Sequence, residues 1–266
     1  MTYEWLLAFS ILGVVVGFVA GLLGVGGGGI MVPALTVMLL AQGIDTESVV
    51  HLALGTSMAC IVFTSIASLR AHRKAGAIVW PVVSKMSGGV ILGTFLATFL
   101  AAQLNSLYLA MFFSAFMGFT AWQMFFKKTA NAEETEISTL QLLSVGTGIG
   151  AISALVSIGG GSLTVPYLTR KGIDIKKAIG TSAAMGLPIS VAGTLGYLVN
   201  GWSKSYGEHL TLGFVFLPAV ACIAVTSFFT APIGAKVAHA LPVAVLKKVF
   251  ALLLVALSIK MLTSVW

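Results

Sequence analysis

Charged side chains are scarce in this sequence. Asp, Glu, Lys and Arg make up 9% of its 266 residues, whereas 58% of the residues are hydrophobic. Ordinary soluble domains carry about 25% charged residues. The mean hydropathy is +1.03, and so few polar side chains cannot cover a soluble fold of this length. The composition therefore excludes a soluble globular protein and indicates an integral membrane protein.

Groups with metal, redox or catalytic chemistry are also scarce. The two cysteines, Cys60 and Cys222, lie in apolar runs and suggest neither a disulfide framework nor a metal motif. No acidic residue is clearly placed at the centre of an apolar run, and no Ser/His/Asp, Cys/His or paired-carboxylate arrangement is visible. We therefore expect no enzyme activity, no metal and no cofactor. Because most basic residues lie in short loops, the net charge of +7 indicates membrane orientation rather than nucleic-acid binding.

Apolar runs near 20 residues recur along the chain, which is the length that crosses a hydrocarbon core of about 30 Å. The segment Met1–Glu4 carries an acid and no base, so no cleavable signal peptide is expected. The predicted helical segments, in chain order, are Trp5–Leu23, Ile30–Leu40, Val49–Leu69, Ile78–Ala102, Tyr108–Phe126, Leu140–Ile158, Leu163–Leu168, Ala178–Val199, Leu212–Val237 and Val243–Leu262. The fold class is all-α and polytopic, with about eight to ten membrane segments.

The order of long and short segments repeats. "LLGVGGGGIMVPAL" in the first half matches "LVSIGGGSLTVPYL" in the second, and "LGTSMA" matches "IGTSAA". The matched prolines, Pro33 and Pro166, lie 133 residues apart, and the matched glycines of the second motif lie 125 apart. We therefore predict a first repeat over 1–126, a cytoplasmic linker over 127–137 and a second repeat over 138–266.

Charge predicts that the two repeats have opposite orientations. The loop "QGIDTES" of the first repeat is acidic, and its counterpart "RKGIDIKK" is basic; the next loops, "RAHRKAG" and "NGWSKSYGEH", differ in the reverse sense. Since basic loops stay on the cytoplasmic side, corresponding loops lie on opposite sides and the repeats are inverted. This is an architecture of secondary transporters. It places both termini outside the membrane.

Each repeat contains a glycine-rich break followed by a short helix with proline in its first turn. Backbone groups exposed at membrane depth must be buried in protein or line a cavity. The first turn of the short helix offers free N–H groups and the positive end of the helix dipole, which together form an anion site without a basic side chain. The candidate substrate-binding residues are therefore Gly26, Gly27, Gly28 and Gly29 in the first repeat and Gly159, Gly160, Gly161 and Ser162 in the second. Inversion should bring the two loops toward each other.

The Gly-Thr-Ser motifs supply hydroxyl groups about two turns into the following long helices. Such small residues also pack membrane helices together, and Ser and Thr often bond to their own backbone. The recurrence of the motif after each broken segment favours ligand binding by Thr56, Ser57, Thr181 and Ser182. His51 and its aligned counterpart Lys176 are vestibule candidates, against the simpler interpretation that both lie near the interface.

Two other interpretations of the first glycine phrase are weaker. A P-loop would require a Gly-Lys-Ser/Thr sequence, which is absent, and no βαβ unit surrounds the phrase. The main alternative to an anion site is a role in helix packing alone. We assign Gly17, Gly21 and Gly24 to packing because they precede the break at helical spacing.

The duplicated motifs resemble the sulfite exporter TauE/SafE family of membrane permeases over nearly the whole chain. The matching residues are Gly17, Gly21, Gly24, Gly26–Gly28, Val32, Pro33 and Gly55–Ser57, echoed by Gly159–Gly161, Val165, Pro166 and Gly180–Ser182. The resemblance implies outward transport of sulfite, sulfoacetate or related organosulfonates across the cytoplasmic (inner) membrane of a prokaryote. Gly29 stands where the second repeat has Ser162, which leaves the polar makeup of the first loop open.

The leading functional hypothesis is an alternating-access transporter whose partners are a small anion and the lipid bilayer. An anion channel, or a permease for another small anion, is the alternative. A membrane enzyme would need a catalytic pair at membrane depth, which the sequence does not offer. The identity of the anion, the coupling ion and the oligomeric state, a homodimer included, stay open.

Overall fold

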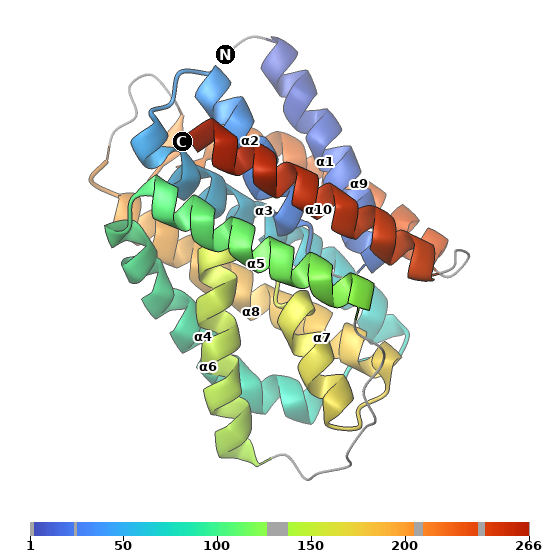
Figure 1. Cartoon of the computed structure of the whole chain (residues 1–266). Coiled ribbons are helices and arrows are strands. Elements are labelled where there is room, and N and C mark those ends of the chain that lie inside the picture. Colours follow the sequence, from blue (N-terminus) through green and yellow to red (C-terminus); the bar gives the residue numbers. More distant parts are fainter. Residues whose placement is uncertain (1–2, 24–25, 127–137, 205–209, 239–242, 266) are drawn as a thin grey trace.

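The computed structural model describes residues 3–23, 26–126, 138–204, 210–238 and 243–265. The described chain is almost entirely helical (Figure 1). The helices of the first half are α1 (Tyr3–Leu23), α2 (Gly28–Ala41), α3 (Thr46–Lys74), α4 (Trp80–Gln103) and α5 (Ser106–Phe126). Those of the second half are α6 (Thr139–Val156), α7 (Gly161–Arg170), α8 (Ile175–Gly201), α9 (Leu217–Ala238) and α10 (Val243–Val265).

The predicted order of long and short segments is confirmed in both halves. The short helices α2 and α7 each begin two residues earlier than predicted, so Pro33 and Pro166 are each the sixth residue of their helix and lie in its second turn, not its first. A proline there has no N–H for the carbonyl four residues before it. The carbonyls freed in this way belong to Gly29 and Ser162, at the start of each short helix.

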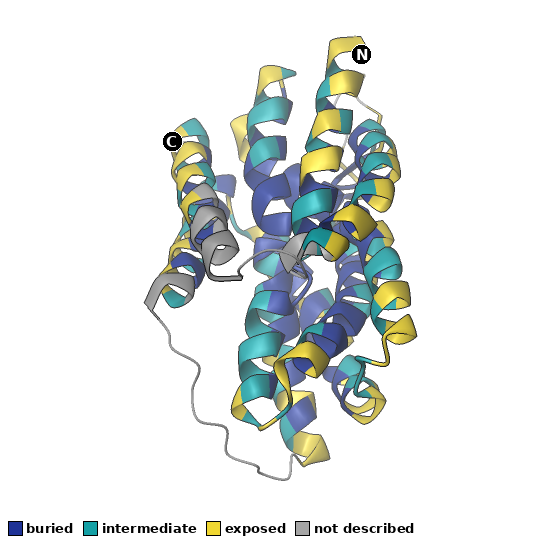
Figure 2. Cartoon of the chain, turned by 90° about the vertical axis from the view of Figure 1, so that its right-hand side faces the viewer, coloured by how far each residue is buried: buried dark blue, intermediate teal, exposed yellow. Residues whose placement is uncertain are grey.

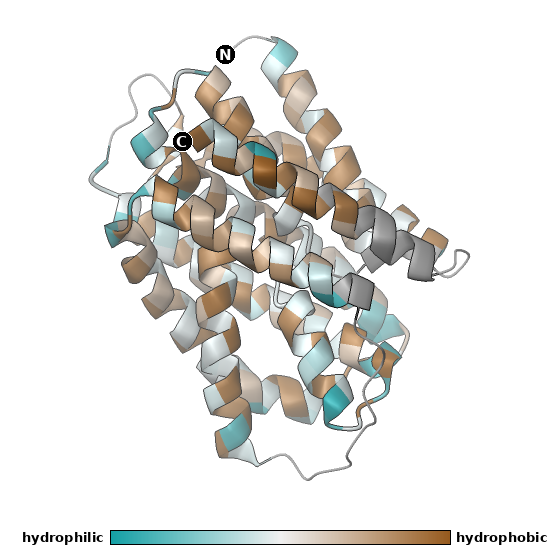
Figure 3. Cartoon of the chain, viewed as in Figure 1, coloured by the Kyte–Doolittle hydropathy of each residue, from teal (hydrophilic) through white to brown (hydrophobic). Residues whose placement is uncertain are grey.

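The fold is that of an all-α polytopic membrane protein. Six of the described helices are long and apolar enough to cross a membrane: α1, α3, α4, α6, α8 and α9. Figure 3 shows apolar residues along the outer faces of the helices and hydrophilic residues gathered near several helix ends. Exposed side chains such as Leu7, Leu96 and Phe229 form an apolar surface that a soluble monomer does not expose. In a bilayer this surface faces lipid.

The two broken segments form helical hairpins, each with one long and one short arm. In Figure 1 the outer ends of α1 and α2 both lie at the top, while the outer ends of α6 and α7 both lie at the bottom. Each short helix therefore returns to the side from which its long partner entered. The two hairpins enter the molecule from opposite sides.

The helix pairing keeps its pattern when the halves are exchanged. Helix α1 packs along α9 and α6 packs along α4, while α3 packs on α8 and α5 on α10. The central pair α3 and α8 is antiparallel, because a Cβ placed on Gly186 would meet Ser65 and one placed on Gly193 would meet Met58. Corresponding helices at the centre of the protein thus run in opposite directions.

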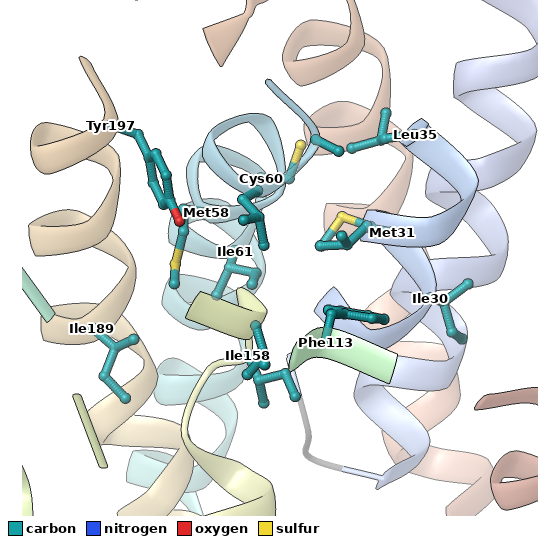
Figure 4. Close-up of a cluster of buried hydrophobic side chains, with 14 of the residues drawn as sticks. Ile30, Met31, Leu35, Met58, Cys60, Ile61, Phe113, Ile158, Ile189 and Tyr197 are labelled. Atoms are coloured by element: carbon teal, nitrogen blue, oxygen red, sulfur yellow. The ribbon is translucent and has the colours of Figure 1, made fainter. Parts of the chain in front are cut away.

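The buried residues gather in the interior of the helix bundle (Figure 2). The most apolar stretch of α3 is 83% buried, against 28% for α1, so α3 is central and α1 is peripheral. Figure 4 shows how the two hairpins and α3 share one cluster of side chains. It includes Met31 of α2, Ile61 of α3, Phe113 of α5 and Ile158 from the loop before α7, all 3% exposed or less. The core therefore holds the glycine loops in place from both halves.

The start of the ninth segment differs from the prediction. Residues expected to continue an apolar helix from Leu212 instead form a two-stranded antiparallel hairpin, β1 (Thr211–Leu212) with β2 (Val215–Phe216). Gly213 makes the turn at φ +55°, and the Phe214 N–H donates to the Tyr197 carbonyl at 3.2 Å. Helix α9 therefore begins only at Leu217, and the hairpin covers the end of α8.

Candidate anion-binding site

Each glycine loop bends the chain into a short helix in the same way. Gly27 precedes α2 at φ +77° and Gly160 precedes α7 at φ +78°, both in the left-handed region that favours glycine. The first N–H groups to donate across each loop are those of Ile30 and Leu163. Among the described residues no backbone acceptor engages the amides before them, so both helix starts present unpaired donors there, together with a positive dipole end.

The two glycine loops meet at the centre of the protein. A Cβ placed on Gly28 would lie 1.7 Å from the Ser157 carbonyl oxygen, and one on Gly26 would lie 3.2 Å from the Gly159 nitrogen. Only glycine permits this approach at Gly28, because any side chain there would overlap the other half of the molecule. The structure thus brings together the two loops that the sequence predicts to face each other.

A cleft of about 50 Å³ runs from these loops along α3 toward its Lys74 end. Gly26 and Gly159 lie at the inner end of the cleft, and α8 and α9 contribute small residues to its walls. Its volume exceeds the roughly 10–15 Å³ that a water molecule needs. The cleft therefore gives a small polar solute access to the backbone of both loops.

The polar wall of the cleft comes from α3 and was missed by the sequence analysis. It consists of Thr64, Ser65, Ser68 and His72. Thr64 donates to the Ile61 carbonyl at 3.1 Å, whereas no hydrogen bond engages the Ser65 or Ser68 hydroxyl within the described part of the chain. The four-residue spacing of positions 64, 68 and 72 places them on one helix face, which is the signal that could have found them.

The end of α3 adds positive charge near the cleft. His72, Arg73 and Lys74 occupy its last turn, where cations also interact favourably with the negative end of the helix dipole. Clustered positive charge raises the local concentration of anions. The cleft is thus electrostatically suited to attract an anion while its inner end contains no basic side chain.

The threonines of the two Gly-Thr-Ser motifs connect the halves of the molecule. Thr56 accepts a hydrogen bond from the Phe216 N–H at 2.9 Å, just before α9, and Thr181 accepts one from the Val79 N–H at 3.0 Å, just before α4. Each hydroxyl therefore satisfies a backbone donor at the start of a helix in the other half. Neither threonine lines the cleft.

The glycines and serines of these motifs are also equivalent in the two halves. A Cβ on Gly55 would lie 2.2 Å from the Phe214 carbonyl oxygen, and one on Gly180 would lie 2.2 Å from the Ala77 carbonyl oxygen. Both glycines thus allow close approach of the opposite half. Ser57 and Ser182 are fully buried, and their hydroxyls have no partner within the described residues. Such hydroxyls are rare, which keeps both serines as ligand candidates.

One residue of α3 separates the cleft from the region around Ser57. Ile61 is fully buried, and its side chain lies 3.8 Å or less from a Cβ built on Gly26, Gly28 or Gly159. The aligned residue of the second half is Gly186, which lines the cleft. The cleft is therefore open next to Gly186 of α8, whereas the side chain of Ile61 closes it next to α3.

The remaining predicted residues lie elsewhere. Gly161 is the buried first residue of α7, and Ser162 lines a different cavity, between α5 and α7. His51 is 4% exposed; its Nε2 lies 3.0 Å from the carbonyl oxygens of Ala101 and Leu104, and its ring stacks on Phe214. Lys176 is exposed at the start of α8, where its N–H donates to Asp174. Neither vestibule candidate lines the cleft.

Within the described residues there is no group of three or more His, Cys, Asp or Glu side chains that could hold a metal ion. What the fold does offer is two broken helical hairpins, six helices long and apolar enough to span a membrane, and a cleft between the halves with one polar wall. These features define a multi-pass membrane transport protein.

The chain belongs to the sulfite exporter TauE/SafE family, whose sequence model matches residues 9–261. It is 36% identical over 264 residues to a "Probable membrane transporter protein" of Haemophilus influenzae, covering 97% of this chain and 98% of that protein. It is 26% identical over 247 residues to "Probable membrane transporter protein MJ0441" of Methanocaldococcus jannaschii, covering 89% of each. Identity to "Probable membrane transporter protein YdhB" of Bacillus subtilis is 26% over 249 residues, 91% of this chain and 92% of that one. No solved structure matches the chain.

Proposed function

We propose that the protein is a secondary transporter that exports small sulfur-containing anions, such as sulfite, sulfoacetate or related organosulfonates, by alternating access. The observation that carries this proposal is the meeting of two helix-start glycine loops at the inner end of a hydroxyl-lined cleft. Free amides at a helix start bind anions without a buried cation. Ser65 and Ser68 add donors that carry no charge, which keeps binding weak enough for release.

Two observations support inverted repeats. Helices α3 and α8 are antiparallel although they correspond in sequence order, and the pairing of α1 with α9 becomes that of α6 with α4 when the two halves are exchanged. The opposite charges of corresponding loops agree with this assignment. With basic loops inside, both termini lie outside the cytoplasmic membrane and the cleft beside Ser65 opens to the cytoplasm. The described conformation is then inward-facing.

The sulfur-containing substrate class is supported by membership of the sulfite exporter TauE/SafE family. The direction is supported by energetics, because an inside-negative potential favours expulsion of an anion by about 2.3 kcal/mol per charge per 100 mV. Closure beyond the cleft by Ile61 favours a carrier over an open channel.

Purified protein in liposomes tests the proposal. We expect saturable movement of sulfite or sulfoacetate, and uphill exchange when the opposite side is loaded with excess unlabelled anion. Flux that never saturates and drives no uphill exchange would identify a channel instead. If neither anion moves or binds while the protein stays folded, the substrate assignment is wrong.

A serine pair provides the residue-level test. Ser65→Ala removes a cleft hydroxyl, and a hydrogen bond to a charged ligand contributes about 1.5 kcal/mol or more, so we expect anion affinity to fall about tenfold. Ser84→Ala is the matched control, because Ser84 is exposed and donates to the Pro81 carbonyl of its own helix. Equal affinities for both variants would remove Ser65 from the site.

A further inference from the structure

A second cavity lies between α5 and α7. Its volume is about 250 Å³, and it shares no lining residue with the central cleft. Its walls are formed by Phe119 and Gln123 of α5 and by Ser162, Leu163, Pro166, Tyr167 and Arg170 of α7. We call this cavity the α5–α7 groove.

The groove exists because α5 does not cover α7. In the first half α2 is packed against α10, but among the described residues the corresponding helices α7 and α5 make hardly any contact. Both helices lie on the face of the molecule turned to the viewer in Figure 1. The groove is therefore at the surface of the helix bundle, where the surrounding medium is lipid.

The groove combines an apolar wall with unsatisfied hydrogen-bond donors. Phe119, Leu163 and Pro166 supply the apolar side chains. The hydroxyls of Ser162 and Tyr167 are buried without a hydrogen-bond partner within the described residues. Buried polar groups nearly always have a partner, so these two hydroxyls indicate an acceptor that occupies the groove.

The polar groups are spread along the whole of α7. Arg170 is the last residue of the helix and Ser162 the second, so at 1.5 Å per residue they are about 12 Å apart along its axis. A compact anion such as inorganic phosphate cannot reach both ends. An amphiphile can, with its charged group at Arg170 and further oxygens beside the hydroxyls.

The charged end of the groove lies where anionic headgroups are found. The loop after Arg170 is the basic loop "RKGIDIKK", which the charge pattern assigns to the cytoplasmic surface. Basic pockets between membrane helices on that side bind anionic lipid headgroups. A guanidinium group also matches phosphate oxygens bidentately.

We propose that the α5–α7 groove is a binding site for an anionic phospholipid of the cytoplasmic leaflet. Arg170 and Gln123 bind the phosphate, and Tyr167 and Ser162 donate to glycerol or ester oxygens. The acyl chains lie against Phe119 and the neighbouring apolar side chains. This site is independent of the transported substrate.

The test uses full-length protein, purified in a neutral detergent and stripped of lipid. Dioleoylphosphatidylglycerol and dioleoylphosphatidylcholine are titrated separately, and binding is read from the thermal unfolding midpoint and by native mass spectrometry. A ligand of the native state raises the midpoint with concentration. We expect phosphatidylglycerol to bind more tightly than phosphatidylcholine.

Variants locate the lipid. Arg170→Gln should weaken phosphatidylglycerol binding about fivefold, because one basic residue near an anionic headgroup contributes about 1 kcal/mol. Tyr167→Phe should weaken it less and retain the preference for phosphatidylglycerol. Lys236→Gln is the control, since Lys236 is an exposed cation in the last turn of α9, outside the groove. Its binding should equal that of the wild type.

Four results would overturn the proposal. Equal binding of both lipids would exclude recognition of charge, and an Arg170→Gln variant as tight as the wild type would place the lipid elsewhere. The same Arg170-dependent shift with inorganic phosphate alone would define a small-anion site. A marked gain in phosphatidylglycerol binding when Glu133, Glu134 and Glu136 are all replaced by Gln would point to the acidic linker at 127–137 as the occupant that the lipid must displace.

Discussion

The two broken helical hairpins have similar backbone geometry but differ in what covers them. In the first half a Cβ on Gly29 would lie 2.9 Å from Leu254 of α10 and 3.3 Å from Met117 of α5, so α2 is enclosed. In the second half the aligned position is Ser162, which lines the α5–α7 groove. The glycine at position 29 thus lies where α2 is closely packed, whereas the serine at position 162 lies where α7 borders an open groove. Similar loops serve a tightly held hairpin and a more accessible one.

The contact between the hairpins gives the largest expected effect. Gly28→Ala would place a methyl group 1.7 Å from the Ser157 carbonyl oxygen, so the loops must separate. We expect the variant to lose at least about 3 kcal/mol of stability, the upper part of the range for overpacking. Thermal unfolding in detergent measures this. Gly88→Ala is the control, because nothing lies within 4 Å of its added Cβ, and equal midpoints would contradict the observed contact.

Exchanging the aligned residues tests the difference in cover directly. Gly29→Ser should destabilise the protein by about 1–3 kcal/mol, because the new side chain overpacks against Leu254. Ser162→Gly should cost less than about 1 kcal/mol, the usual penalty for glycine in a helix. Comparing the two unfolding midpoints checks the order. A more damaging Ser162→Gly would show that α7, not α2, is the more tightly held helix.

A third substitution makes the cleft less open beside α8. Gly186→Ala would place its Cβ 2.8 Å from the Ser65 hydroxyl oxygen. If the Ser65 hydroxyl is displaced from a bound anion, the binding free energy should weaken by about 1.5 kcal/mol, or about tenfold in affinity. The protein should lose little stability, because the Ser65 side chain can rotate away. Anion-binding titrations and unfolding midpoints together measure this. Unchanged affinity with the variant folded would show that the anion does not contact this wall.

The smallest effects should be equal in the two halves. Thr56→Val and Thr181→Val each remove an acceptor for a backbone N–H at a helix start. Loss of such a cap costs about 1 kcal/mol, so the two unfolding midpoints should fall by similar amounts. If only one variant is destabilised, the two threonines are not equivalent and the symmetry of the junction is incomplete.

Sequence patterns predicted the architecture because it depends on local rules. Runs of apolar residues define helix lengths, and a glycine-rich stretch followed by proline indicates a break and a short helix, although both short helices begin two residues earlier than predicted. The duplicated motifs also predicted that the two glycine loops face each other. These features needed no knowledge of side-chain packing.

The polar wall of the cleft and the hydrogen bonds of the motif threonines could not be predicted without the three-dimensional structure. Ser65 and Ser68 are isolated hydroxyls in an apolar helix, and only the arrangement of α8 and α9 makes them line a cleft. The sequence predicts that Thr56 contacts the ligand, and it gives no sign that the Thr56 hydroxyl accepts a hydrogen bond from a strand residue 160 positions away. The β-hairpin was missed because the apolar residues from Leu212 to Phe216 continue directly into α9.

The reciprocal threonine bonds have a consequence for the order of synthesis. The ribosome produces the first half in full before Phe216, the donor to Thr56, exists. Conversely, the Val79 N–H awaits Thr181. Until the second half is inserted, the Thr56 hydroxyl lacks its donor and the Val79 N–H lacks its acceptor. Neither half can form all of its hydrogen bonds alone, and the fold is complete only after the helices of the second half have packed against those of the first.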